Sequence, residues 1–238
     1  MVRTSFLRRW RHTKTPLFVI NSNKDREKAM RGRFITLEGI DGAGKSTHLE
    51  TLRHWLEAQG IDVLMTREPG GTPLAETLRG LVLKEPMSAL SETLLMFAAR
   101  HDHCQRRIEP ALAAGRWVIS DRFVDASFAY QGGGRSVPYD QLVELERWVV
   151  GALEPDLTFW FDLDPMLARQ RLDQGRRGAG DRFEQEQQAF FAQVRDGYRR
   201  RFAAKPARLS LIDASRDAEA VRHQVETALA LRFQAWNR

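Results

Sequence analysis

The chain has 238 residues, enough for one α/β domain with a substantial core, and no apolar run near the ~18 residues of a membrane-spanning helix. Its single cysteine, Cys104, excludes an intramolecular disulfide and fits a reducing compartment such as the cytoplasm. The formal net charge of +6 comes from residues 1–30, which hold eight Lys or Arg against two Asp or Glu, whereas residues 31–238 hold 29 of each sign; this balance argues against a nucleic-acid or membrane partner.

Residues 1–30 show neither a helical nor a strand period, and three interpretations compete for them. Leu17–Ile20 is too short for the apolar centre of a secretory signal. The first 24 residues are rich in Arg and free of acidic side chains, which is typical of an organellar transit peptide. The third interpretation, which we favour, is that translation begins at Met30, so that residues 1–30 are a basic, disordered extension before a single domain at 31–238.

The first predicted βα unit contains the most specific motif of the chain. Residues 33–38 are typical of a buried strand, and residues 48–59 of a helix with one apolar face. Between them stands G-x-x-x-x-G-K-[ST], the P-loop, in the strand–loop–helix context that separates it from a glycine-rich turn that binds nothing. In such a loop the backbone N–H groups surround a phosphate, the lysine reaches the β- and γ-phosphates, and the serine binds Mg²⁺. The predicted ATP-binding residues are Gly39, Ile40, Asp41, Gly42, Ala43, Gly44, Lys45, Ser46 and Thr47.

Further strand and helix patterns alternate along the rest of the chain. This alternation predicts a doubly wound, five-stranded parallel sheet of the P-loop NTPase type, with helices on both faces. The remaining strands are expected at 61–66, 116–120, 157–162 and 208–212, and the clearest helices at 91–114, 139–153, 184–202 and 217–233.

Asp121 and Arg122 follow the strand at 116–120, at the edge where ligands bind in open α/β sheets. An aspartate at this place beside a P-loop is the usual acidic partner of Mg²⁺, so Asp121 joins Ser46 as a predicted metal ligand. The neighbouring arginine suits a second phosphate. The alternative is an aspartate that caps the strand and an arginine that is solvated.

Arginines recur at the ends of the predicted loops, and the P-loop already provides one phosphate site. Their surplus indicates a second anionic substrate, since transfer between two phosphates needs positive charge on both. The segment 174–182, basic and flanked by glycines, is predicted to be a lid that excludes water. The arginines in question are Arg67, Arg79, Arg100, Arg122, Arg135, Arg176, Arg177 and Arg182.

Between Arg33 and about Arg232 the chain resembles the thymidylate kinases, which are nucleoside monophosphate kinases. The resemblance implies phosphorylation of dTMP to dTDP with ATP and Mg²⁺, in the cytoplasm, by a homodimer. The P-loop alone is common to many families, but its combination with the other motifs at these separations is specific. The matching stretches are Glu38–Thr47, Thr66–Thr72, Asp121–Phe123 and Ala129–Gly134.

The resemblance also assigns roles to single residues. Arg67, Arg79 and Arg122 would hold the dTMP phosphate, and Arg100 would bind the thymine carbonyl. Phe97, three residues before Arg100, would stack on the base. Many family members place the stacking ring four residues before that arginine, where this chain has Met96, a side chain that we expect in the core. The implied dTMP-binding residues are Asp41, Arg67, Arg79, Phe97, Arg100, Arg122, Ser127, Tyr130 and Gln131, with Tyr130 and Asp41 at the sugar.

Some family members carry an arginine inside the P-loop, and the bacterial ones use lid arginines instead. With Gly42-Ala43 in its loop, this chain resembles the bacterial type, which implies Arg177 as the residue that stabilises the migrating phosphoryl group. Arg182 would contact ATP. The implied catalytic residues are Lys45, Asp121, Arg122 and Arg177.

A regulatory GTPase and a DNA-dependent ATPase are the alternatives from other classes of P-loop protein. The first needs an Asn-Lys-x-Asp motif downstream of the P-loop, which the sequence lacks, and the second is expected to have a basic body. The closer alternative is a kinase of UMP, dGMP or dCMP, from which only the residues that contact the base distinguish this chain.

Overall fold

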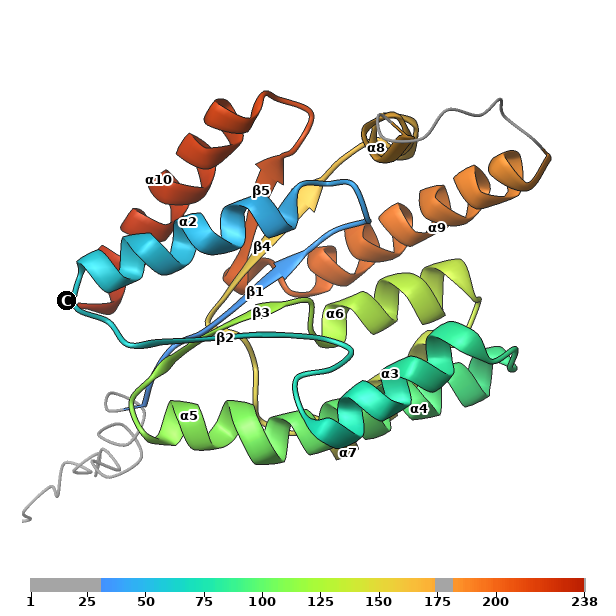
Figure 1. The fold of residues 1–238 in the computed structure, drawn as a ribbon, viewed down its shortest axis with the longest axis horizontal. Helices are drawn as coiled ribbons and strands as arrows, with labels where there is room; N and C mark the ends of the chain where they lie inside the picture. Colours follow the sequence, from blue (N-terminus) through green and yellow to red (C-terminus); the bar gives the residue numbers. More distant parts are fainter. Residues whose placement is uncertain (1–30, 174–181, 238) are drawn as a thin grey trace, which may run out of the picture. The chain divides into compact units, whose positions relative to one another are not determined.

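The computed structural model describes residues 31–173 and 182–237, which contain a five-stranded sheet (Figure 1). All neighbouring strands pair in parallel, in the order β2-β3-β1-β4-β5. The five predicted strands are confirmed, with their ends shifted by two residues at most. The strands are β1 (Phe34–Glu38), β2 (Val63–Arg67), β3 (Trp117–Asp121), β4 (Leu157–Asp162) and β5 (Leu209–Asp213).

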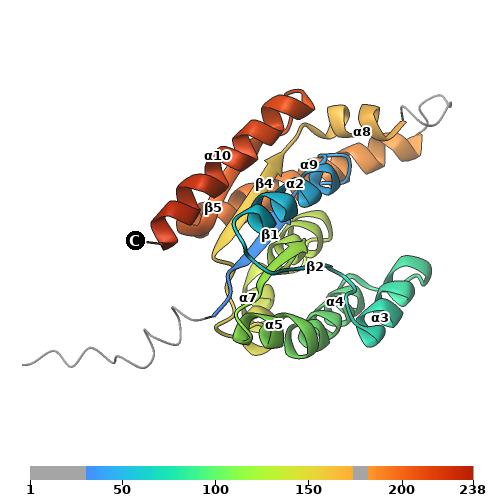
Figure 2. The ribbon, with the colours of Figure 1, turned by 60° about the vertical axis from the view of Figure 1, so that its left-hand side comes forward.

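Helices cover both faces of the sheet, as predicted. They are α2 (Lys45–Ala58), α3 (Pro73–Lys84), α4 (Ala89–His103), α5 (Glu109–Ala113), α6 (Val124–Ser127), α7 (Tyr139–Val149), α8 (Pro165–Asp173), α9 (Arg182–Ala204) and α10 (Ala218–Trp236). Helices α2 and α10 lie on one face, and α4, α5, α7 and α9 lie on the other (Figures 1 and 2). In the described part of the chain, no helix is both long enough and apolar enough to cross a bilayer.

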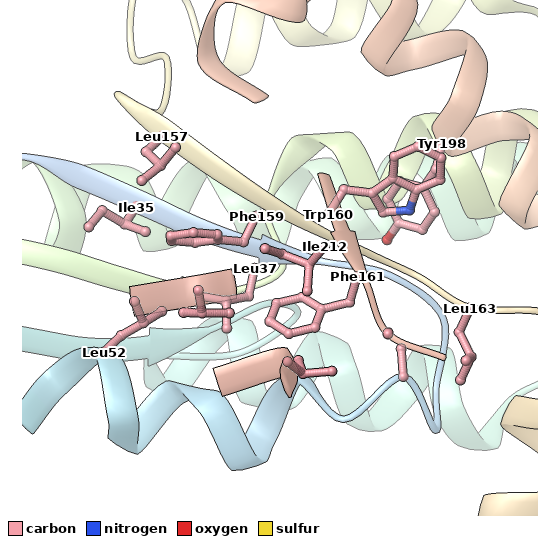
Figure 3. Packing of buried hydrophobic residues seen from close by; sticks show 14 of the residues in the cluster. Ile35, Leu37, Leu52, Leu157, Phe159, Trp160, Phe161, Leu163, Tyr198 and Ile212 are labelled. Atoms are coloured by element: carbon pink, nitrogen blue, oxygen red, sulfur yellow. The ribbon is translucent and has the colours of Figure 1, made fainter. Parts of the chain in front are cut away.

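The three central strands, β1, β3 and β4, are buried on both faces, and their side chains enter two hydrophobic clusters. Ile35 and Leu37 of β1 pack with Phe159 of β4 against Leu52 of α2 (Figure 3). Phe34 points to the opposite face and joins the second cluster, with α4, α5 and α7. This two-sided burial explains why the strands are continuous apolar runs rather than alternating ones.

Two predicted helices differ from the observed ones. The helix expected at 91–114 is divided, because α4 ends at His103 and a π-helical segment, Cys104–Ile108, leads into α5. Pro110 lies at the start of α5. Because proline has no backbone N–H, a continuous α-helix through this position would lack one of its hydrogen bonds. The helix expected at 139–153 ends at Val149, since Gly151 adopts a φ of +58°.

Candidate active site

The P-loop connects β1 to α2, and no side chain caps the start of the helix. Gly44, the residue before α2, has a φ of +86°. Gly39 and Gly42 also have positive φ, and a Cβ added to either would lie 2.6 Å from a backbone oxygen, that of Phe161 or of Ala168. Glycine is therefore required at both positions. The uncapped helix and the closely packed loop form the arrangement that binds polyphosphates.

Lys45 is buried at the base of the P-loop, and its ammonium group donates to two carbonyl groups of the same loop. Nζ lies 2.9 Å from the oxygen of Gly39 and 3.0 Å from that of Ile40. Burial, together with the positive charge of Arg122, lowers the pKa of Lys45 to about 8. The surroundings of Lys45 thus disfavour the charged form of its ammonium group.

Asp121 and Arg122 lie at the carboxyl end of β3, facing the P-loop. Arg122 has a φ of +70°, unusual for a residue with a side chain, and the Ser120 hydroxyl donates to its carbonyl oxygen at 2.6 Å. Its guanidinium group donates to Oδ1 of Asp41 in the P-loop, also at 2.6 Å. Oδ1 of Asp121 is buried and has no hydrogen-bond partner. These two residues therefore present a guanidinium group and an unpaired carboxylate oxygen beside the phosphate loop.

A cavity of about 320 Å³ lies between the P-loop, the end of β3 and α8. Arg171 of α8 contributes to its wall, and its guanidinium group is held by the backbone oxygen of Ala214 at 2.9 Å. Sequence reasoning missed Arg171, because it considered arginines at loop ends, whereas this one lies inside a helix. The lining residues are Asp41, Gly42, Gly44, Lys45, Ser46, Asp121, Arg122, Arg171 and Leu172.

Glu38, the last residue of β1, is a second buried ionisable group at this edge that the sequence did not single out. One carboxylate oxygen accepts from the backbone N–H of Phe123 at 2.7 Å, and the other from the hydroxyl of Tyr198 in α9 at 2.9 Å. Burial raises the pKa of Glu38 to about 8. The side chain thus links β1, the segment after Arg122 and α9.

Arg100 lies on α4, whose Phe97 belongs to the second hydrophobic cluster, and is 1% exposed. Its Nε donates to Glu68 at 2.7 Å and its Nη2 to the carbonyl oxygen of Phe123 at 3.3 Å. Nη1 is buried and has no partner. A buried donor without a partner is costly, so it marks a place where an acceptor from outside the chain fits.

Ser127 and Gln131, on α6 and on the π-helical segment Phe128–Gly134, also carry unpaired buried atoms. Gln131 donates from Nε2 to Glu92 at 2.9 Å, which leaves its Oε1 buried and without a partner, and Oγ of Ser127 is in the same state. The ring centroid of Tyr130 lies 4.7 Å from the guanidinium carbon of Arg122. Burial raises the pKa of Tyr130.

The structure distinguishes the two side chains that sequence reasoning considered for stacking on a base. Phe97 is 1% exposed, and the guanidinium carbon of Arg100 lies 4.8 Å from its ring centroid. Phe97 therefore belongs to the core, and its ring packs against the guanidinium group of Arg100. Met96 is half-buried and is the one of the pair with free surface.

The remaining predicted arginines lie around the turn after β2, at the end of the π-helical segment Phe128–Gly134, or outside the described residues. Arg67 is half-exposed and pairs with Glu76 at 2.9 Å, and Arg79 donates to the carbonyl oxygen of Pro69 at 3.0 Å. Arg135 lies 3.4 Å from Glu92. Arg176 and Arg177 lie outside the described residues, as does the side chain of Arg182, whose backbone begins α9.

Comparison with known proteins agrees with this geometry. The family model described as "Thymidylate kinase" matches residues 37–225. The thymidylate kinase of Methylobacillus flagellatus is 55% identical over 196 residues, which cover 82% of this chain and 96% of that protein. Those of Burkholderia vietnamiensis and Nitrosospira multiformis are each 53% identical, over 84% of this chain and 98% of their own length. The chain belongs to the thymidylate kinase family.

Proposed function

We propose that this protein transfers the γ-phosphoryl group of ATP to dTMP, giving dTDP and ADP. The family supports the reaction. The observation that carries it in the structure is that two buried side-chain atoms, Nη1 of Arg100 and Oε1 of Gln131, have no hydrogen-bond partner. A kinase that bound ATP alone would have no use for them.

These two atoms match the hydrogen-bonding edge of thymine. The arginine can only donate, as required by the carbonyl oxygen at C4. Glu92 takes the amide nitrogen of Gln131, so its oxygen is left to accept from the ring N3–H. Cytosine presents the reverse pattern, an amino group and an unprotonated nitrogen, and would leave a donor facing a donor at one position and an acceptor facing an acceptor at the other. A pyrimidine with carbonyl groups is therefore the best match.

Positive charge for the dTMP phosphate comes from Arg122, with Arg67 and Arg79 at the neighbouring turn. Arg122 lies at the edge between the P-loop cavity and Tyr130, so it can reach a phosphate that lies between the two substrates. Its present partner, Asp41, has a 63% exposed side chain and can be released from this ion pair, to accept from the sugar hydroxyl of dTMP.

ATP fits the P-loop cavity as the phosphate donor, with Lys45 beside its β- and γ-phosphates. Mg²⁺, when bound, neutralises the phosphate oxygens and lowers the energy of the transition state. The exposed hydroxyl of Ser46 and the unpaired Oδ1 of Asp121 suit a hard cation that also takes phosphate oxygens and water. Among the described residues, no group of three or more His, Cys, Asp or Glu forms a cage of its own for a metal, in agreement with such a shared site.

The transfer step needs positioning rather than a general base. An oxygen of the dTMP phosphate forms a bond to the γ-phosphorus, the bond from that phosphorus to the β–γ bridging oxygen breaks, and its electron pair leaves with ADP. The attacking oxygen is already anionic, so no proton must be removed from it. Lys45 and Arg122 neutralise charge on the two sides of the migrating group, and Arg177 from the predicted lid at 174–182 completes this role.

A homodimer is part of the proposal, and the exposed leucines of α3 and α4 support it. The two helices pack against each other at the edge of the helix layer (Figure 2). Leu74 and Leu81 recur on one face of α3, and Leu90 and Leu94 on one face of α4, with exposed fractions of 43–51%. Exposed apolar side chains at helical spacing are typical of a subunit interface.

The domain assignment and the location remain part of the same proposal. Residues 31–238 form the kinase domain, and the basic residues 1–30 are an extension without a role in the reaction. The cytoplasmic location rests on Cys104, since it is the chain's single cysteine and it is buried as a free thiol.

The test is a coupled assay of ADP release with ATP and Mg²⁺, in which dTMP, dUMP, UMP, dCMP and dGMP are offered separately. We expect the highest kcat/KM with dTMP, and dUMP within about 10- to 200-fold of it, because one methyl group in an apolar pocket is worth only that much. Arg100→Met should remove most of the activity toward dTMP. The matched control is Arg106→Met, since Arg106 lies in the π-helical segment that follows α4 but its side chain is 74% exposed.

A clear preference for another nucleotide would keep the kinase but overturn the assignment of the base site. Hydrolysis of ATP without transfer to any of the five nucleotides would overturn the proposed reaction.

A further inference from the structure

Arg100 is held by a chain of buried polar side chains to which neither the sequence nor the proposed reaction gives a role. Glu68 directly follows β2 and is 4% exposed. One of its carboxylate oxygens accepts from Nε of Arg100 at 2.7 Å, and the other lies 3.0 Å from Nδ1 of His103. His103 itself is fully buried. Both oxygens of the carboxylate are thus occupied by side chains of α4, one turn apart.

The chain continues from His103 to β2. Nε2 of its ring lies 2.6 Å from Oγ1 of Thr66. A carboxylate paired with a guanidinium group accepts hydrogen bonds only, so its contact assigns the ring proton to Nδ1, and Nε2 then accepts from the threonine hydroxyl. Each atom of the imidazole that can form a hydrogen bond has a defined partner, and the ring has one orientation.

The turn after β2 closes over this ring and leaves it no space to rotate. Gly71 has a φ of +91°, and a Cβ at this position would lie 2.5 Å from Nε2 of His103 and 2.8 Å from Oγ1 of Thr66. Arg79 stabilises the backbone of this turn by donating to the carbonyl oxygen of Pro69. The histidine is therefore fixed by packing as well as by hydrogen bonds.

This arrangement determines where Nη1 of Arg100 points. The guanidinium group is planar, so fixing Nε at Glu68 and Nη2 at the carbonyl oxygen of Phe123 also fixes the direction of the third nitrogen. The rings of Phe97 and Phe123, at 4.8 and 5.8 Å from the guanidinium carbon, restrict its movement out of the plane. Nη1, the nitrogen of this group that has no hydrogen-bond partner, is therefore held in one direction by the residues around it.

We propose that Glu68 and His103 are positioning residues that aim Arg100 at the C4 carbonyl group of the pyrimidine and so set the preference for thymine over cytosine. The inference rests on the proposed function. A guanidinium group held in one orientation discriminates strongly, because it cannot turn away from the amino group of cytosine. If the chain of contacts is loosened, Arg100 gains freedom, and the preference falls even though the arginine is still present.

The experiment compares kcat/KM for dTMP and for dCMP in the full chain and in three variants. His103→Leu removes both hydrogen bonds of the ring, Glu68→Gln keeps the shape of the side chain but removes its charge, and Thr66→Val removes only the donor to Nε2 with little change of volume. The matched control is Thr93→Val, because Thr93 is fully buried on α4 but donates to the carbonyl oxygen of Ala89 rather than to this chain of contacts. The melting temperature is measured for each protein.

We expect the ratio of kcat/KM for dTMP to that for dCMP to fall about tenfold in His103→Leu and in Glu68→Gln, mainly through a higher KM for dTMP, and by a smaller factor in Thr66→Val. The control should melt at a lower temperature and keep the wild-type ratio. If folded variants keep the wild-type ratio, the residues only stabilise the fold and the inference is wrong. Thr66→Val keeps this test decisive if the larger changes prevent folding. A wild-type protein that does not prefer dTMP to dCMP would instead overturn the proposed function itself.

Discussion

Binding of ATP should be accompanied by uptake of a proton at Lys45. In the free protein, burial brings the pKa of this lysine to about 8, with Arg122 as a second cause, whereas Asp121, Asp41 and Glu38 act in the opposite direction. A bound triphosphate adds several negative charges beside the ammonium group and returns its pKa toward the ordinary value near 10.5.

The size of the effect follows from this shift. With a pKa of about 8, Lys45 carries its proton in roughly 90% of free molecules at pH 7, 50% at pH 8 and 10% at pH 9. Binding should therefore take up about 0.1, 0.5 and 0.9 proton at these three values of pH. Because only the protonated form binds well, the affinity for ATP should fall about tenfold between pH 7 and pH 9.

Isothermal titration calorimetry measures this uptake when ATP with Mg²⁺ is titrated at pH 8 in two buffers of different ionisation enthalpy. Glu38 titrates in the same range, since burial raises its pKa to about 8, so a control is needed that keeps Glu38 unchanged. Lys45→Arg retains the positive charge without a titration near pH 8. Equal proton uptake by the wild type and by this variant would refute the reasoning for Lys45.

Three further predictions concern stability and assembly. Gly197→Ala should lower the free energy of unfolding by about 1–2 kcal/mol in urea titrations, because its Cβ would lie 2.8 Å from the Cα of Ala129 in the facing π-helical segment. A variant more stable than the wild type would contradict this close contact. Asp125→Asn should cost about 3 kcal/mol or more in the same measurement, since it leaves the buried Arg201 and Arg208 without their shared carboxylate, and an unchanged midpoint would contradict this. Leu94→Glu should give a monomer in light scattering, and a dimer of unchanged stability would place the interface elsewhere.

The parts of the site that could be predicted from the sequence are those encoded in contiguous residues. The P-loop needs only its glycines and the elements on either side, so residues 39–47 were identified together with their helix. Asp121 and Arg122 were identified in the same way, because they directly follow an apolar strand. Strand ends and helix ends were predicted less well, since the division of the helix at 91–114 depends on the local geometry around Pro110.

The residues that the sequence did not reveal act through partners far along the chain. Glu38 is useful only because Tyr198 returns to it from α9, and His103 only because Thr66 and Glu68 lie beside it. Such pairs depend on the tertiary arrangement of the elements, for example on the sheet order that places β3 between β2 and β1. In the sequence, such a residue can be noticed only as an ionisable side chain at the end of, or within, an otherwise apolar element. This pattern does not identify the side chain with which it interacts.

The central claim is that the buried, unpartnered atoms of Arg100 and Gln131 read the base of dTMP. A crystal structure of the protein with dTMP tests it most directly. The account predicts that the C4 carbonyl oxygen of thymine lies within about 3.2 Å of Nη1 of Arg100, and that the ring N3–H donates to Oε1 of Gln131. A base bound elsewhere, with these two atoms still without partners, would contradict it.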